Sequence, residues 1–405
     1  MTDSHSISPA PGAVEHASAN NHNNVSRLAI AQALAGANTA VFYAIGAVIG
    51  AGLAPDAALA TLPISIFVVG MAAFILPTGI IARRYGRRAA FIAGTSCGVL
   101  TGLLAALAVF WGQFWLFCTA TFFGGAYAAV VLTFRFAAAD GVSPELRPRA
   151  LSIVMAGGVA AGVIGPQLVT LTMNLWAPHT FVVTFLVQAL VAALAGLVLM
   201  GVRVPAPSAE ETATGGRKLS VLATQPRFLI AVTCGAVSYM LMNFLMTAAP
   251  LAMHLHGHSQ ESANNGLQWH IIAMYAPSFF TGRLITRYGS NIIVAVGLAM
   301  IGASTAIGLA GVSVLHFWAM LVLLGVGWNF GFVGASAMVL ECHRPEERTR
   351  VQALNDFIVF GTMAVGSFSS GELLASHGWN SVLWVSFIPL ALVIVTIVLI
   401  RQLRS

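Results

Sequence analysis

The stretch that decides the fold covers residues 58–88. It reads ALATLPISIFVVGMAAFILPTGIIA over 58–82 and continues as RRYGRR over 83–88. The first part has no charged side chain, and about 20 apolar helical residues cross a hydrocarbon core roughly 30 Å thick. The arginines that follow favour the side of a membrane on which positive charge is retained. The stretch therefore predicts a membrane-spanning helix with a basic end.

The composition of the whole chain indicates the same class. Of its 405 residues, 58% are hydrophobic and only 8% are charged, and the mean hydropathy is +0.85. A soluble domain carries roughly 25% charged residues, so these few charges do not cover an aqueous surface. We expect an all-α membrane protein. Its apolar blocks predict twelve transmembrane helices, over 28–53, 58–82, 89–110, 114–139, 150–175, 181–201, 228–253, 267–285, 292–310, 317–340, 351–375 and 382–400.

A polar stretch over 202–226 separates the first six helices from the last six. It contains three prolines and a Gly-Gly pair, which are typical of a linker. The start of the chain is rich in Ser, Asn and His and lacks the pattern of a cleavable signal peptide. The expected divisions are a disordered tail over 1–27, six-helix bundles over 28–201 and 227–401, and a short tail over 402–405.

The basic residues predict the orientation. They fall in alternate loops, whereas the loops around Asp56, Gly112, Pro178, Ser259, Val314 and Gly378 contain no Lys or Arg. Positive charge is retained in the cytoplasm, so we expect a multi-pass protein of the cell inner membrane with both termini cytoplasmic. This asymmetry explains the net charge of +6 without a nucleic-acid partner.

The two halves repeat each other in two separate loops. Arg84-Tyr85-Gly86 recurs as Arg287-Tyr288-Gly289, an offset of 203 residues. Asp140, Pro144, Glu145, Arg147 and Arg149 recur as Glu341, Pro345, Glu346, Arg348 and Arg350, each at an offset of 201. Matches at nearly one offset indicate a duplicated six-helix unit, and the predicted fold is two pseudo-symmetric bundles.

These loops carry a family resemblance over almost the whole chain. The segment GIIARRYGRR at 79–88, its weaker echo over 282–289 and the two Pro-Glu-x-Arg-x-Arg loops resemble the major facilitator superfamily. That family's first loop reads GxxxDRxGRR, and Arg83 stands here where an aspartate is expected. The resemblance implies a secondary transporter that works by alternating access, with helices 1, 4, 7 and 10 lining a central cavity. It implies no enzyme and no cofactor.

Candidate binding residues lie at mid-membrane depth on the helices that the resemblance makes cavity-lining. Trp328 and Asn329 lie together in the expected tenth helix, where an aromatic ring and an amide could stack on and hydrogen-bond a planar solute; packing against another helix is the alternative. We also expect substrate contacts from Asn38, Tyr43, Tyr239, Asn243 and Arg135. Arg135 could instead extend its side chain to the cytoplasmic surface.

Candidate gating residues lie at the cytoplasmic ends. Arg84, Arg87 and Arg88 could act in the gate, although retention of positive charge alone would also explain them. Asp356, within the first two turns of the eleventh helix, could carry a proton. Because Arg83 replaces the family's acid, we expect a reversed pair between Arg83 and Asp356 when the cytoplasmic side is closed. Glu346 and Glu347 are the alternative partners.

The glycines of the expected fifth helix allow two interpretations. Gly157, Gly158, Gly162 and Gly165 precede Pro166, a pattern that resembles the family's antiporter motif without its trailing glycine pair. Small residues also let membrane helices approach closely. Close packing is the simpler interpretation.

The sequence predicts a class of function rather than a single substrate. We expect secondary active transport of a small organic solute, with protons as the coupling ion and a planar metabolite or drug as substrate, by a monomer. Riboflavin import and multidrug efflux are the specific alternatives, and a channel or a membrane sensor is the alternative class. No phosphate-binding loop is present. His254, His256 and His258 lack further ligands nearby, so no metal site is expected.

Overall fold

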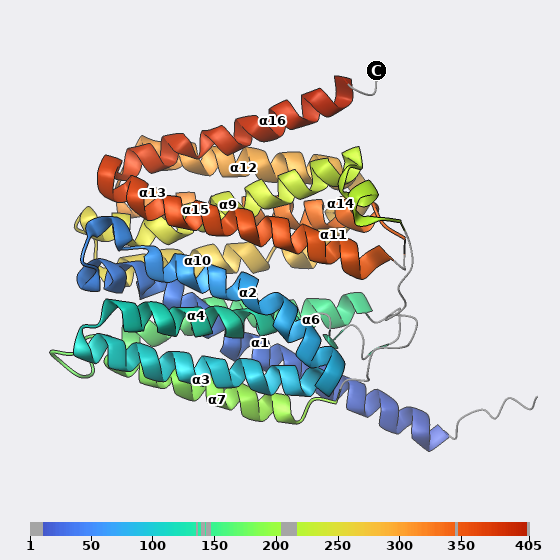
Figure 1. Cartoon of the computed structure of the whole chain (residues 1–405), viewed down its shortest axis with the longest axis horizontal. Helices are drawn as coiled ribbons and strands as arrows, with labels where there is room; N and C mark the ends of the chain where they lie inside the picture. Colours follow the sequence, from blue (N-terminus) through green and yellow to red (C-terminus); the bar gives the residue numbers. More distant parts are fainter. Residues whose placement is uncertain are drawn as a thin grey trace, which may run out of the picture.

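The computed structural model describes residues 11–134, 137–138, 142, 147–203, 217–344 and 347–402, and within them the chain forms a bundle of helices (Figure 1). The first half contributes α1 (Pro11–Leu53), η1 (Ala57–Leu59), α2 (Leu62–Tyr85), α3 (Arg87–Trp111), α4 (Phe114–Val131), α6 (Arg147–Thr172) and α7 (Val182–Met200). The second half contributes α8 (Leu219–Ala223), α9 (Pro226–Leu255), α10 (Gln260–Tyr275), α11 (Ser278–Tyr288), α12 (Ser290–Ala310), α13 (Val314–Trp328), η2 (Asn329–Val333), α14 (Gly334–Leu340), α15 (Arg348–Val385) and α16 (Phe387–Gln402).

The described helices account for twelve membrane crossings. Ten segments are long and apolar enough to cross a membrane, and the last of them, Leu354–Thr396, spans 43 residues. Gly378 has non-helical torsion angles (φ 77°, ψ 179°) within it, so this segment turns back and makes two crossings, as the α15–α16 hairpin in Figure 1 shows. The short helices α10 and α11 follow each other directly and supply one more. The predicted all-α fold with twelve membrane helices is confirmed.

Four helices differ clearly from the expected ranges. α4 ends at Val131 rather than at residue 139. α1 begins at Pro11 rather than at residue 28, in the region expected to be a disordered tail. The expected eighth helix is interrupted between α10 and α11 at Ala276–Pro277, where proline removes a backbone donor. The expected tenth helix contains a π-helical segment, η2, and so consists of α13, η2 and α14. Both interruptions flank the cavity described below.

The duplication extends from the loops into the packing of the helices. A Cβ placed on Gly125 of α4 would meet the carbonyl oxygen of Phe67 at 2.0 Å, and one on Gly325 of α13 would meet that of His270 at 2.6 Å. Gly125 and Gly325 are 200 residues apart, and Phe67 and His270 are 203 apart. The same close helix contact is therefore built twice, at nearly the offset found in the loops.

The repeated Arg-Tyr-Gly turns have one geometry. Gly86 and Gly289 both have φ of 85°, a left-handed conformation that favours glycine. In each turn the arginine lies over the neighbouring tyrosine ring, at 5.4 Å for Arg84 and 5.2 Å for Arg287. The same turn therefore sets the direction of α3 relative to α2 in the first half and of α12 relative to α11 in the second half.

The glycines of α6 pack against helices of both halves. A Cβ on Gly157 would meet the carbonyl oxygen of Ala29 on α1 at 2.3 Å, and one on Gly162 would meet the Ile271 side chain on α10 at 2.8 Å. These contacts are those expected of small residues at a close helix crossing.

Both ends of the described chain lie at one end of the bundle, on the right in Figure 1. The Arg-Tyr-Gly turns and both ends of the connection between the halves are also there, and we name it the basic end. Asn24 fixes the start of that connection: its amide donates to the Arg203 carbonyl (2.7 Å) and accepts from the Arg203 N–H (3.0 Å). Arg27 donates to the carbonyl of Gly201. These bonds tie the extended start of α1 to the end of the first half.

Glu347 fixes the other end of the connection. Its fully buried carboxylate accepts hydrogen bonds from the Arg217 side chain, with N–O distances of 2.8 and 2.7 Å, and from the Arg217 and Arg344 backbone N–H groups. The hydrogen bonds from Arg217, followed by that from Arg344, hold the pKa of Glu347 well below its usual range. The carboxylate therefore stays ionised and anchors the connection to the start of α15.

Candidate functional site

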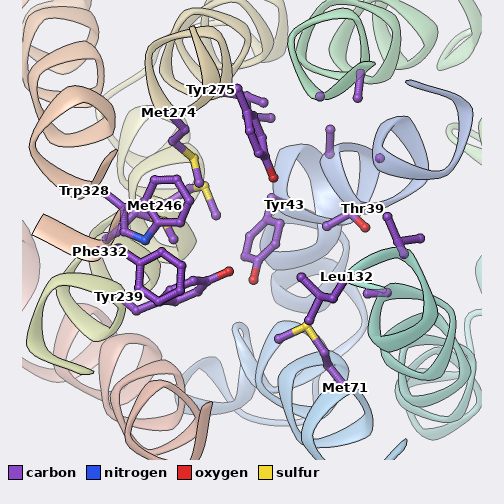
Figure 2. Close-up of a pocket in the computed structure, with 18 of the residues that line it drawn as sticks. Thr39, Tyr43, Met71, Leu132, Tyr239, Met246, Met274, Tyr275, Trp328 and Phe332 are labelled. Atoms are coloured by element: carbon purple, nitrogen blue, oxygen red, sulfur yellow. The ribbon is translucent and has the colours of Figure 1, made fainter. Parts of the chain in front are cut away.

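A cavity of about 170 Å³ lies between the two halves near the middle of the bundle. Figure 2 shows its aromatic residues: Tyr239, Trp328 and Phe332 form a wall from the second half, and Tyr43 faces them from α1. Tyr275 lies at the end of α10 beside them, and sulfur atoms of Met71, Met246 and Met274 point inward. The site is thus a largely apolar chamber with three phenol groups.

The second-half wall is ordered by ring contacts. Trp328 and Phe332 stack with their centroids 5.3 Å apart and their planes at 13°. Tyr239 meets both edge-on, at 5.4 Å from Trp328 and 4.9 Å from Phe332. Residues four apart on a helix lie on the same face, and the π-helical segment η2 begins immediately after Trp328. Such segments often occur at functional sites.

Asn329 faces away from the chamber and holds the interrupted helix together. Its amide donates to the Met274 carbonyl and to the Ser278 hydroxyl, both at 2.7 Å, and its oxygen accepts from the Thr281 hydroxyl at 2.7 Å. The break before Ser278 frees the Met274 carbonyl from its helical partner. Asn329 replaces that partner, and so couples η2 to the α10–α11 break and positions Met274 and Tyr275 at the cavity.

The chamber is closed on the side away from the basic end. There the Tyr43 hydroxyl donates to the Asn243 side chain across the two halves at 2.7 Å. Ser65 and Ser367 are bonded between α2 and α15 at 3.0 Å. Gln167 on α6 donates to Gln268 on α10 at 2.8 Å. Each of these bonds joins uncharged groups, so closure of this end involves no ion pair between these residues.

The charged residue nearest the chamber is on α15. Of the described residues that line the cavity, Asp356 is the one with a charged side chain, and it lies toward the basic end. The Asn355 amide donates to its carboxylate at 3.1 Å. A carboxylate that faces a cavity between the two halves can interact with a solute or exchange a proton with water.

The structure brings some of the expected site residues together and separates others. Tyr43, Tyr239, Trp328 and Asp356 line the cavity. Asn243 is fully buried against Tyr43, and Asn38 faces a small second hollow inside the first half, with Tyr127 and Gln188. Arg135 lies outside the described residues.

Three of the expected gate arginines lie at the basic end. Arg84, Arg87 and Arg88 lie at the basic end where α2 turns into α3, with Arg84 over Tyr85. The Arg83 side chain and all of Glu346 lie outside the described part of the chain. Glu347 accepts hydrogen bonds from Arg217 and from the Arg344 backbone, and its pairing with Arg83 stays an alternative prediction. The pair between Arg83 and Asp356 stays a prediction.

Several cavity residues were not expected from the sequence, although signals for two of them are present. Phe332 follows Trp328 by four residues, so the two share a helix face. Thr39 precedes Tyr239 by 200 residues, close to the repeat offsets of 201 and 203 in the loops, and both line the cavity. Met71, Met274 and Tyr275 carry no such signal because their position depends on how the two halves meet.

Comparisons with known proteins agree with the fold. The family model described as Major Facilitator Superfamily matches residues 28–277 and 234–405. Among solved structures, a bacterial homologue of the human lysosomal transporter Spinster has a TM-score of 0.73 at 15% identity, covering 95% of this chain and 97% of that one. The xylose transporter XylE from E. coli has a TM-score of 0.70 at 12% identity, covering 93% and 96%.

Sequence relatives cover nearly the full length. The riboflavin transporter RfnT of Brucella anthropi is 45% identical over 378 residues, which are 93% of this chain and 95% of the relative. The MFS-type transporter YdeG of Bacillus subtilis is 28% identical over 369 residues, 87% and 86% of the two chains. The chain belongs to the Major Facilitator Superfamily and is a multi-pass membrane transporter rather than an enzyme.

Proposed function

We propose that this transporter carries riboflavin into the cell. The observation that carries the proposal is the group of aromatic side chains that line the chamber, Tyr43, Tyr239, Trp328 and Phe332, in a chain 45% identical to a riboflavin transporter. Riboflavin joins a flat, uncharged tricyclic ring to a chain of hydroxyl groups. A flat ring suits stacking on aromatic side chains, and the phenols of Tyr43, Tyr239 and Tyr275 supply polar contacts.

The indole of Trp328 supports the ring as the recognised group. Its Nε1 is buried and has no hydrogen-bond partner among the described residues. A buried N–H without a partner costs roughly 1–3 kcal/mol, which a carbonyl or ring nitrogen of a bound flavin would offset. A sugar hydroxyl could also accept from this donor, but a sugar has no flat ring to stack on the aromatic side chains.

We infer an orientation and a coupling ion from the charges. The basic end faces the cytoplasm, so the end closed by Tyr43 and Asn243 faces outward, and the membrane is the cell inner membrane. Protons drive uptake through Asp356, which lines the chamber. Protonation of Asp356 would release Arg83, whose pairing with it closes the cytoplasmic side. The two bundles, 28–201 and 227–401, rock about the chamber in a monomer.

A second candidate is efflux of planar drugs. Five methionines line the chamber: Met71, Met155, Met242, Met246 and Met274. Flexible thioether side chains adapt to ligands of many shapes. A chamber of this kind would accept several flat apolar compounds.

The proposal is tested by measuring the uptake of labelled riboflavin into three sets of vesicles. Their interior is more acidic than the outside, more alkaline than the outside, or at the same pH. We expect uptake against a concentration gradient when the outside is acidic, and saturation by unlabelled riboflavin. A drug panel measured in inverted vesicles tests efflux. Absence of riboflavin uptake together with drug accumulation in inverted vesicles would reject the first function in favour of the second.

A further inference from the structure

Two contacts between the halves close the outer end: one between α6 and α10, the α6–α10 seam, and one between α2 and α15, the α2–α15 seam. The two seams have different chemistry. Asn264 on α10 donates to the Thr170 hydroxyl on α6 at 2.9 Å. Their equivalents at the repeat offsets of 203 and 201 are Thr61 and Gly371. These two are also neighbours, because a Cβ on Gly371 would overlap the Thr61 hydroxyl. The α6–α10 seam thus has a hydrogen-bonded amide where the α2–α15 seam has a plain contact.

The next turn repeats this difference. Gln268 on α10 bonds to Gln167, and its equivalent at an offset of 203 is Ser65, which bonds to Ser367. Ser367 is one residue from the position equivalent to Gln167. Ser65 and Ser367 are fully buried, whereas Gln167 and Gln268 are partly exposed. Two small hydroxyls therefore close one seam, and closure alone does not require amides at the other.

Further amides continue the α6–α10 seam. Gln260 donates to the side chain of Asn264 at 2.9 Å and to the Ala44 carbonyl on α1 at 3.2 Å. Gln167 also approaches Asn265 at 3.4 Å. The seam is uncharged, and each amide both donates and accepts hydrogen bonds.

This seam is continuous with the chamber. Ile271, which lines the cavity, follows Gln268 by three residues, so the two differ in depth by only about 5 Å along α10. When the outer end opens, the bonds from α10 to α6 break, because these helices belong to different halves. Gln268, Asn264 and Gln167 then face the outer vestibule without their partners.

We propose that the α6–α10 seam is an outer subsite for the hydroxylated chain of the substrate, a role that rests on the proposed riboflavin transport. Neutral hydroxyl groups replace the amide partners that are lost on opening, while the flat ring enters the aromatic chamber. Gln268, Asn264 and Gln167 hold the chain, and they return to one another when the outer end closes. They therefore determine specificity for substrates that carry such a chain.

The test compares riboflavin with lumiflavin, which has the same ring system and a methyl group in place of the hydroxylated chain. The variant Gln268→Ser/Asn264→Thr gives the seam the residues of its equivalent positions, Ser65 and Thr61. We expect its KM for riboflavin uptake to rise about five- to tenfold. The inhibition constant of lumiflavin should not change, and the maximal rate should change little.

Two control variants separate recognition from gating. Ser65→Ala removes a bond across the α2–α15 seam and should leave the ratio of the two constants at its wild-type value. Gln268→Asn keeps an amide and should retain most of the preference for riboflavin. If the double variant changes the KM of riboflavin and the inhibition constant of lumiflavin by the same factor, the ratio of the two constants is unchanged. That result would overturn the subsite while leaving riboflavin transport intact. Failure of the wild type to take up riboflavin would overturn the proposed function and the subsite with it.

Discussion

Trp328 and Asn329 are neighbours in the chain but serve different parts of the molecule. Trp328 stacks on Phe332 at the chamber wall, whereas Asn329 bonds to Met274, Ser278 and Thr281 behind it. The sequence places both at mid-membrane depth, and hydropathy does not distinguish a residue facing a cavity from one facing a neighbouring helix. The two residues should therefore respond differently to substitution.

Replacing Trp328 should weaken substrate binding. Stacking of a flat ring on an aromatic side chain contributes about 1–3 kcal/mol, and 1.4 kcal/mol corresponds to tenfold in affinity. We expect Trp328→Ala to raise the KM of riboflavin uptake about tenfold or more, and Trp328→Phe to raise it less because a ring remains. An unchanged KM in Trp328→Ala would remove the indole from the binding site.

Replacing Asn329 should instead lower stability. Asn329→Ala leaves the Met274 carbonyl and the Ser278 and Thr281 hydroxyls without this partner, at a cost of about 1–3 kcal/mol for a buried group. We expect a lower melting temperature in detergent, measured by thermal denaturation, and less properly folded protein. Asn329→Asp, which keeps the acceptor for Thr281, is the matched variant. Normal stability in Asn329→Ala would contradict its role at the helix break.

Helix breaks mark the limit of sequence-based prediction at the scale of elements. Hydropathy and charge predicted the helices because each must satisfy its backbone and cross the apolar layer on its own. Pro77, Pro166 and Pro250 lie inside continuous helices, whereas Pro277 lies at a break. The local sequence does not separate these cases. The difference is Asn329, which lies on another helix, 55 residues along the chain from Met274, and stabilises the freed Met274 carbonyl.

The anchor at the start of α15 should be sensitive to acid. Because the folded-state pKa of Glu347 is lowered, its stabilising contribution is complete above the unfolded-state value of about 4.3 and is lost as pH falls below it. At pH values under about 4.3, we expect the melting temperature of the wild type to decrease more steeply with falling pH than that of Glu347→Gln. Glu372→Gln is a control on the same helix. Parallel pH profiles for wild type and Glu347→Gln would contradict the anchor.

At the scale of the whole molecule, the two halves meet through small numbers of neutral bonds at the outer end. Each such bond contributes about 0.5–1.5 kcal/mol, and coupling free energies of 1–3 kcal/mol change an equilibrium between two states by 5- to 150-fold. The duplication was predictable from the loops because equivalent residues recur there at one offset. The contacts between the halves were not, since each partner is more than 100 residues from the other in most of these pairs.

A disulfide across the outer end should stop transport. Ser65 and Ser367 have their hydroxyl oxygens 3.0 Å apart, so cysteines at both positions have side chains of the right length to meet. We expect Ser65→Cys/Ser367→Cys, with the four native cysteines replaced, to lose uptake after oxidation and regain it after reduction. The single variants are the controls. Full uptake by the oxidised, cross-linked protein would show that these helices need not separate.

The proposed gate at the cytoplasmic end is tested by exchanging its charges. Arg83→Asp and Asp356→Arg should each impair uptake, because each brings like charges together, and the double variant should recover a substantial part. Asp356→Asn should in addition lose the dependence of uptake on the pH gradient. A double variant no better than the worse single one would reject the reversed pair.

The bond between Tyr43 and Asn243 joins equivalent positions, since they are 200 residues apart, as are Arg27 of α1 and Arg227 of α9. Two equivalent positions that touch lie on the twofold pseudo-axis. In a dimer of identical six-helix chains, one residue type would have to face itself there, so that a phenol would meet a phenol or an amide an amide. A single chain that contains both halves does not have this restriction. Position 43 is a donor and position 243 an acceptor, so the twofold pseudo-symmetry is broken at its own axis.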